Sequence, residues 1–184
     1  MSRKKITAVI PIRKGSQRVP DKNFKEFFEG KNLLELKIES LKQVPLIDEI
    51  IVNTDSQEAI DIAKANNILY FRREDYFASN KCTNTEHWYN IAETTQSDLI
   101  MHVPCTAPFI KSKTYYDLIN RFILSSNDSA NTVSLIKEYL WLDSKPLNYD
   151  GNNPMFYVVS DEESVDIDTP LDFEFAQHLY KNRN

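Results

Sequence analysis

The chain has 184 residues, 41% of them hydrophobic and 27% charged, with a formal net charge of −5 at pH 7. Its length predicts a single domain over residues 1–184 with a sizeable hydrophobic core. The acidic balance excludes the broad basic face of a general nucleic-acid-binding protein, and no stretch approaches the ~20 apolar residues of a membrane span. Cys82 and Cys105 are the only cysteines, and two lone thiols predict reduced side chains in a cytoplasmic protein. The charge and the short apolar runs predict a soluble protein without a nucleic-acid or membrane partner.

The first apolar run, residues 6–12, predicts a strand that is buried on both faces of a parallel sheet. A basic loop follows it directly. Cations around a turn of small residues, with exposed backbone N–H groups, suit a polyanion such as a nucleoside triphosphate. The alternative is an ordinary solvated loop. The loop contains, in order, Arg13, Lys14, Gly15, Ser16, Arg18 and Lys22.

Hydrophobic periodicity predicts alternating strands and helices along the rest of the chain. The order β-α-β-α-β in the first half predicts a parallel sheet with right-handed crossovers, and therefore an α/β fold. On the helix at 85–95, we expect Trp88, Ile91 and Ala92 to face inward. The predicted strands are 47–53, 68–71, 98–103, 130–136 and 155–159, and the predicted helices are 32–43, 58–66, 85–95, 112–124 and a C-terminal helix from 170.

An acidic segment precedes the C-terminal helix. If residues 164–168 are extended, Asp166 and Asp168 point to the same face. Two neighbouring carboxylates favour a divalent cation, and Mg²⁺ prefers one or two carboxylates together with substrate phosphates. The alternative is that one carboxylate caps the helix and the other is solvated. Thr169 is the expected N-cap, and Asp172 is expected in the first helical turn.

The order of residues in the basic loop is distinctive. The pattern I-P-x-R-x-G-S-x-R-x-P-x-K-N over residues 10–23 resembles the N-terminal signature of the sugar-acid cytidylyltransferases. Its final Lys22-Asn23 is more similar to the acylneuraminate branch than to the branch that acts on an eight-carbon acid. The D-x-D-T-x-x-D pattern at residues 166–172 is similar to the segment that holds catalytic Mg²⁺ in the family. The resemblance implies a three-layer, Rossmann-like nucleotidyltransferase fold with a mostly parallel central sheet.

The resemblance also implies a reaction, in which CTP and a sugar acid give a CMP-sugar and pyrophosphate. The implied catalytic residues are Arg13, Lys22, Asp166 and Asp168, of which the two aspartates would bind Mg²⁺. Arg73 matches a family arginine that precedes an A-S-D segment, here Ala78-Ser79-Asn80, and Asp55 is expected to support the site. The implied nucleotide-binding residues are Arg13, Gly15, Ser16, Arg18, Lys22, Asn23, Arg73, Thr83 and Asn84; for the last two, an equal alternative is a purely local capping role.

The resemblance weakens between residues 135 and 158. Relatives in the acylneuraminate branch often have Q-P-T-S-P-L-R where this chain has V-P-C-T-A-P-F at 103–109. A family insertion that contributes to the dimer is shortened here to about 138–154. The sequence therefore leaves open the sugar acid, which is either a sialic acid-like nonulosonic acid or an eight-carbon ulosonic acid, and whether a homodimer forms. A non-catalytic nucleotide- or sugar-binding relative and an enzyme for another nucleoside triphosphate are the alternative functions.

Overall fold

A computed structural model describes the chain except for residues 1–2, 16–17, 135–140, 143–144, 147–152 and 184. The predicted helices and strands are present with ends shifted by one or two residues, apart from the strand at 130–136, which ends at Val133. The strands are β1 (Ile6–Ile12), β2 (Glu26–Phe28), β3 (Lys31–Asn32), β4 (Glu49–Thr54), β5 (Leu69–Arg72), β6 (Leu99–His102), β7 (Ser129–Val133), β8 (Trp141–Leu142), β9 (Lys145–Pro146) and β10 (Pro154–Val158). The helices are α1 (Leu33–Lys42), α2 (Gln57–Ala65), α3 (Asp75–Ala78), α4 (Asn84–Thr94), α5 (Ser112–Ile123) and α6 (Pro170–Lys181).

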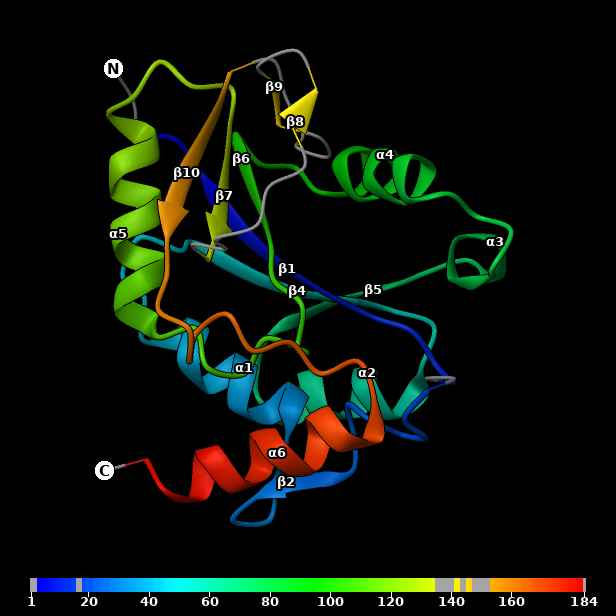
Figure 1. The fold of residues 1–184 in the computed structure, drawn as a ribbon. Coiled ribbons are helices and arrows are strands. Elements are labelled where there is room, and N and C mark those ends of the chain that lie inside the picture. Colours follow the sequence, from blue (N-terminus) through cyan, green and yellow to red (C-terminus); the bar gives the residue numbers. More distant parts are fainter. Residues whose placement is uncertain (1–2, 16–17, 135–140, 143–144, 147–152, 184) are drawn as a thin grey trace.

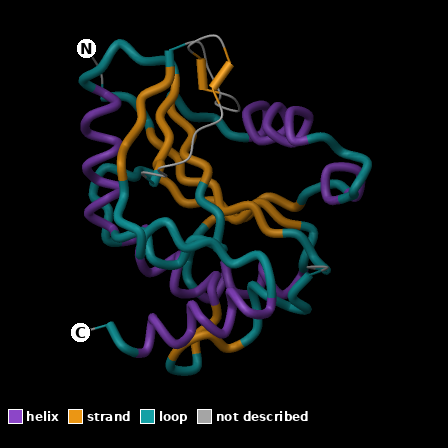
Figure 2. The backbone as a smooth tube through the Cα atoms, in the orientation of Figure 1, coloured by secondary structure: helices purple, strands orange, loops and turns teal. Residues whose placement is uncertain are grey.

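The central sheet has four parallel strands in the order β5-β4-β1-β6. Figure 2 shows these strands crossing the middle of the molecule between helices. In register, Val9 of β1 lies between Ile51 of β4 and His102 of β6. All residues of β1 except Pro11 are buried, because β1 has a strand on each side and helices over both faces. The predicted parallel α/β fold is confirmed.

Helices cover the sheet in layers. α1, α2 and α6 lie on one side of the sheet, and α3 and α4 lie on the other (Figure 1). The main hydrophobic core is on the side of α1, where Ile10 and Val52 of the sheet meet Leu34 and Ile38 of α1 and Phe173 of α6. Burial of such side chains contributes about 1.5–3 kcal/mol each. None of the helices in the described part combines the length and the apolarity that crossing a membrane requires.

β7 and β10 form a separate parallel pair beside α5 (Figure 1). Between this pair and β6 lies a cavity of about 730 Å³, which is lined by side chains from β6, β7 and α5. Asn131 on β7 lines the cavity, and its buried Nδ2 has no hydrogen-bond partner among the described residues. The excursion predicted at 138–154 falls largely outside the described residues.

Side-chain caps fix where several helices begin. Asn32 and Thr169 form capping boxes at α1 and α6, and Ser56 accepts a hydrogen bond from the backbone N–H of Ala59 at α2. Each cap provides an acceptor for a backbone N–H that the first helical turn leaves unpaired. The predicted cap at Thr169 and the predicted place of Asp172 in the first turn are confirmed.

The inward face predicted for α4 is wrong in part. Ile91 is buried, but Trp88 is 38% exposed and Ala92 is exposed. His87 and Asn90 are half-buried instead, and within the described part of the chain the buried atoms His87 Nδ1 and Asn90 Oδ1 have no hydrogen-bond partner. Trp88 keeps contact with the sheet through the ring of His102, at a centroid distance of 4.1 Å. Between β5 and α4, where no helix was predicted, lies the short helix α3.

The capping box of α1 gives the first prediction. Asn32→Ala should lower the free energy of unfolding by about 1 kcal/mol, because the backbone N–H of Glu35 loses its acceptor. Asn32→Asp retains an acceptor oxygen and serves as the matched control. Urea denaturation measures both variants, and equal stability of Asn32→Ala and the unchanged protein would contradict the role of the cap.

Candidate functional site

The basic loop leaves β1 through a turn that other elements hold in place. The backbone N–H of Lys14 donates to Asp55 Oδ1 at 2.7 Å, and Arg13 Nη1 donates to Asn80 Oδ1 at 2.7 Å. Gly15 has φ +76° with open space around it, so the turn needs glycine for its backbone freedom and not for lack of room. Asp55, which we expected near the site, therefore anchors the loop. Ser16 lies outside the described residues.

The two predicted motifs, from opposite ends of the chain, meet in space. Arg18 Nη2 forms an ion pair with Asp168 Oδ1 at 3.1 Å. Lys22 Nζ donates to the backbone carbonyl of Ile167 at 2.5 Å, although the two residues are 145 positions apart. The cations of the loop and the carboxylates of the acidic segment thus form one cluster at the carboxyl end of β1, where open α/β sheets bind their ligands.

Lys22 is the buried cation of this cluster. Burial lowers the pKa of its amino group, and the carboxylates of Asp166 and Asp168 act in the opposite direction. Its hydrogen-bond acceptor is a neutral carbonyl group rather than a carboxylate. The positive charge of Lys22 is therefore only partly compensated within the protein, which suits a group that binds an anionic substrate.

Asp166 and Asp168 lie on either side of Ile167, which is fully buried, and both are accessible to solvent. Extended backbone with its middle residue buried places both carboxylates on the outward side. In the described part of the chain, no three acidic, histidine or cysteine side chains are grouped so that they could hold a metal. Two carboxylates beside a cationic loop nevertheless fit Mg²⁺, which usually takes its remaining ligands from substrate phosphate and water.

Arg73 is buried at the end of β5. Its Nε donates to Asn53 Oδ1 at 2.7 Å and its Nη2 donates to the Asn53 carbonyl at 2.8 Å. Burial lowers its pKa to about 10, while Asp55 acts in the opposite direction and Arg13 acts in the same one. Arg73 therefore lies near the basic loop, and Asn53 fixes its orientation.

The remaining predicted nucleotide-binding residues differ in whether their polar side-chain atoms already have hydrogen-bond partners. Thr83 is the N-cap of α4, and its hydroxyl group exchanges hydrogen bonds with Glu86, so the capping alternative describes its side chain. Asn84 is the exposed first residue of that helix. Asn23 Oδ1 is buried, and no described residue forms a hydrogen bond with it. Of the three, Asn23 offers an unused polar atom beside the loop.

Sequence reasoning missed two asparagines that organise the site. Asn53 holds Arg73, and Asn80 holds Arg13. Asn53 had a detectable signal, because it lies near the carboxyl end of a predicted parallel strand, where ligand-binding residues gather. Asn80 stands where the family pattern has aspartate, and its role depends on a contact between residues 67 positions apart.

A doubly wound parallel sheet with a cationic loop after its first central strand, joined by paired carboxylates from the C-terminal segment, defines a protein of the nucleotidyltransferase class. In agreement, the fold is similar to the solved structure of CMP:2-keto-3-deoxy-manno-octonic acid synthetase, with a TM-score of 0.75 at 15% identity, over 96% of this chain and 98% of that one. Residues 7–155 match the cytidylyltransferase family. The chain therefore belongs to the cytidylyltransferases.

Two bacterial relatives place the chain more closely within this family. It is 24% identical to the N-acylneuraminate cytidylyltransferase of Escherichia coli O18:K1:H7, over 99% of this chain and 54% of the relative. It is 31% identical to a pseudaminic acid cytidylyltransferase of Campylobacter jejuni, over 62% of this chain and 52% of the relative. The chain thus spans about half the length of these relatives. These similarities confirm the predicted sugar-acid cytidylyltransferase family.

The two histidines beside Arg73 give a prediction about acid stability. Burial, and then nearby positive charge, lowers the pKa of both His87 and His102 to about 4 from an ordinary 6.5. Below pH 6.5 the unfolded chain binds protons that the native chain does not, so the free energy of unfolding should fall between pH 6.5 and pH 5.

Urea denaturation at pH 7 and pH 5 measures this fall, and proton NMR follows each histidine ring. His87 and His102 should show no protonation above pH 5. His178→Gln, which changes an exposed histidine on α6, should leave the fall unchanged. Titration of His87 and His102 near pH 6.5 would show that their surroundings do not disfavour the charged form.

Proposed function

We propose that the chain catalyses the transfer of a cytidylyl group from CTP to a sugar acid, which gives a CMP-sugar and pyrophosphate. The observation that carries this proposal is the contact of the basic loop with the acidic segment, through the Arg18–Asp168 ion pair and the bond from Lys22 to the Ile167 carbonyl. It creates a site that can bind a triphosphate on one side and a metal on the other.

In the proposed reaction, the anomeric hydroxyl oxygen of the sugar acid forms a bond to the α-phosphorus of CTP. The bond from that phosphorus to the bridging oxygen of the β-phosphate breaks, the pyrophosphate leaves with the electron pair, and the proton of the attacking hydroxyl group passes to water. Arg13, Arg18 and Lys22 would bind the triphosphate and neutralise the charge that develops on the leaving group. Asn23 and Arg73 would help to position the nucleotide, since positioning supplies a large part of catalysis of this kind.

Asp166 and Asp168 are the residues that would hold Mg²⁺. When bound, Mg²⁺ would neutralise phosphate charge and polarise the reacting oxygens. Arg18 pairs with one oxygen of Asp168, and this ion pair helps to keep the two parts of the site together. Both partners of the pair are more than a third exposed, so their separation costs little when a substrate competes for Arg18.

The sugar acid is the finer part of the proposal. The relatives are named for N-acylneuraminate and pseudaminic acid, which favours a sialic acid-like nonulosonic acid for this chain. An eight-carbon ulosonic acid is the alternative substrate. A non-catalytic relative is the second candidate function, and it is favoured by the V-P-C-T-A-P-F segment at 103–109, which lacks the glutamine and the arginine of the family pattern. The predicted cytoplasmic location and homodimer stay predictions.

The proposal predicts pyrophosphate release when the protein is incubated with CTP, Mg²⁺ and one member of a panel of sialic, legionaminic, pseudaminic and eight-carbon ulosonic acids. Release should stop when a chelator removes the metal, and it should be much weaker with ATP, GTP or UTP. Binding of CTP by calorimetry without release on any acid would favour the non-catalytic relative. Absence of CTP binding would contradict the proposal entirely.

Asp168→Asn tests the metal site in the active protein. We expect a loss of turnover of about 100-fold or more, because the metal and the transferred phosphate lose a charged ligand. Thermal stability should change little, since the Arg18–Asp168 pair is exposed and contributes about 0–1 kcal/mol.

Asp161→Asn is the matched control, because Asp161 is an exposed aspartate in the preceding turn. It should keep normal turnover. Near-normal turnover of Asp168→Asn would contradict the assignment of the metal site.

A further inference from the structure

A lysine occupies the buried face of α1. The buried residues of this helix are Leu33, Leu34, Lys37, Ile38 and Leu41, and Lys37 is only 2% exposed. Burying an amino group costs free energy unless it is well bonded. A methionine would fill a similar volume without this cost. The position of Lys37 therefore requires an explanation beyond packing.

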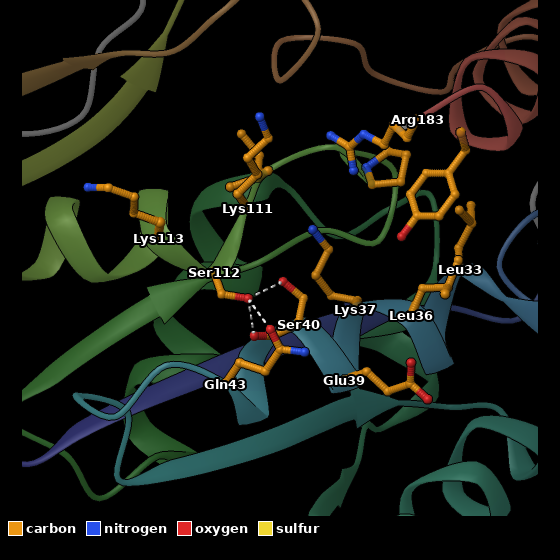
Figure 3. A pocket seen from close by; sticks show the side chains of 13 residues that line it. Leu33, Leu36, Lys37, Glu39, Ser40, Gln43, Lys111, Ser112, Lys113 and Arg183 are labelled. Carbon is orange, nitrogen blue, oxygen red and sulfur yellow. Dashed lines mark hydrogen bonds between the residues drawn. The ribbon is translucent and has the colours of Figure 1, made fainter.

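The amino group of Lys37 bonds to two elements other than α1. Its Nζ donates to the Ala107 carbonyl at 2.6 Å and to the Tyr115 hydroxyl at 2.8 Å. Figure 3 shows the side chain pointing away from α1 into the space between Lys111 and Arg183. The amino group thus ties α1 to α5 and to the segment that follows β6.

No acidic side chain in the described part of the chain compensates the charge of Lys37. Burial lowers its pKa to about 8, and the charged or titratable groups that act on it are Cys105 and Arg183. Burial also raises the pKa of the Cys105 thiol to about 12, so this thiol is neutral at pH 7. The bonds to Ala107 and Tyr115 are therefore the main interactions that keep the amino group in place.

The segment that Lys37 holds is hydrogen-bonded to the acidic part of the site. Thr106, the neighbour of Ala107, accepts a hydrogen bond through its carbonyl from the Ile167 N–H at 2.9 Å. The Ile167 carbonyl in turn accepts the bond from Lys22 at 2.5 Å. Both backbone polar groups of Ile167 are thus fixed, and Ile167 lies between Asp166 and Asp168. A continuous set of bonds connects Lys37 to the two carboxylates.

We propose that Lys37 is a positioning residue for the carboxylates of Asp166 and Asp168. By holding the Ala107 carbonyl, it fixes the segment on which Ile167 rests, and Ile167 sets the direction of the aspartates on either side. The buried amino group is a local cost in stability that is kept because it orders the site, as is common where function and stability conflict. The expected effect of Lys37 on turnover rests on the proposed function, whereas its expected effect on the backbone at Ile167 does not.

Lys37→Met tests the proposal. We expect the amide hydrogen of Ile167 to exchange about tenfold faster or more, because its acceptor at Thr106 is no longer held in place. Amides of β1 should exchange as before. Two-dimensional NMR in deuterated water measures exchange at each residue, and it requires neither a substrate nor a metal.

Lys42→Met is the matched control. Lys42 is on the same helix and also donates to a backbone carbonyl, that of Asn66, at 2.7 Å. This contact lies away from the segment after β6, so exchange at Ile167 should be unchanged. If the protein is active, Lys37→Met should also need more Mg²⁺ for half-maximal turnover while its melting temperature is equal or higher, and Lys42→Met should not.

Two outcomes would overturn the proposal. Unchanged exchange at Ile167 in Lys37→Met would show that Lys37 does not hold this segment. Faster exchange throughout the chain, together with a lower melting temperature, would show that Lys37 only supports the core. Failure of the proposed function would appear separately, as a lack of turnover in the unsubstituted protein, and would leave the exchange result valid.

Discussion

The site depends on the bond between the Lys22 amino group and the Ile167 carbonyl. This bond joins the loop after the first strand to the segment before the last helix, and the Arg18–Asp168 ion pair lies beside it. The ion pair is exposed and therefore weak, whereas Lys22 is buried. The buried bond thus sets the separation of cations and carboxylates, and the proposed function requires a triphosphate with its metal to fit between these groups.

Buried cations bound to carbonyl oxygens recur in this protein. Lys22, Lys37 and Arg73 donate to the backbone carbonyls of Ile167, Ala107 and Asn53. Burial lowers the pKa of all three groups, because a neutral acceptor compensates the charge less than a carboxylate would. Carbonyl acceptors orient a cation without neutralising it. Lys22 and Arg73 therefore keep positive charge for the anionic substrate of the proposed reaction, while Lys37 uses the same type of bond to order the backbone.

The sequence was informative where local physical chemistry dominates. The run of β1 is apolar at successive positions, and successive side chains of a strand point to opposite faces, so it predicts burial on both faces. Thr169 predicts a helix start because its hydroxyl group can accept a backbone hydrogen bond. It failed on the orientation of α4. Helical spacing alone placed Trp88 and Ala92 inward, but both are exposed, and Trp88 contacts the sheet through the ring of His102. His87 and Asn90 are half-buried instead, and His87 lies near the charge of Arg73.

The sequence by itself determined the parallel α/β fold and the two motifs of the site, because strand burial, helix capping and loop charge depend on residues that are close together in the sequence. The tertiary structure decided which residues complete the site. Asn80 holds Arg13, Asn53 holds Arg73, and Lys37 holds the segment under Ile167 through contacts between residues 20 to 70 positions apart. Such contacts exist only after the crossovers have brought strand ends together, so no local pattern can encode them.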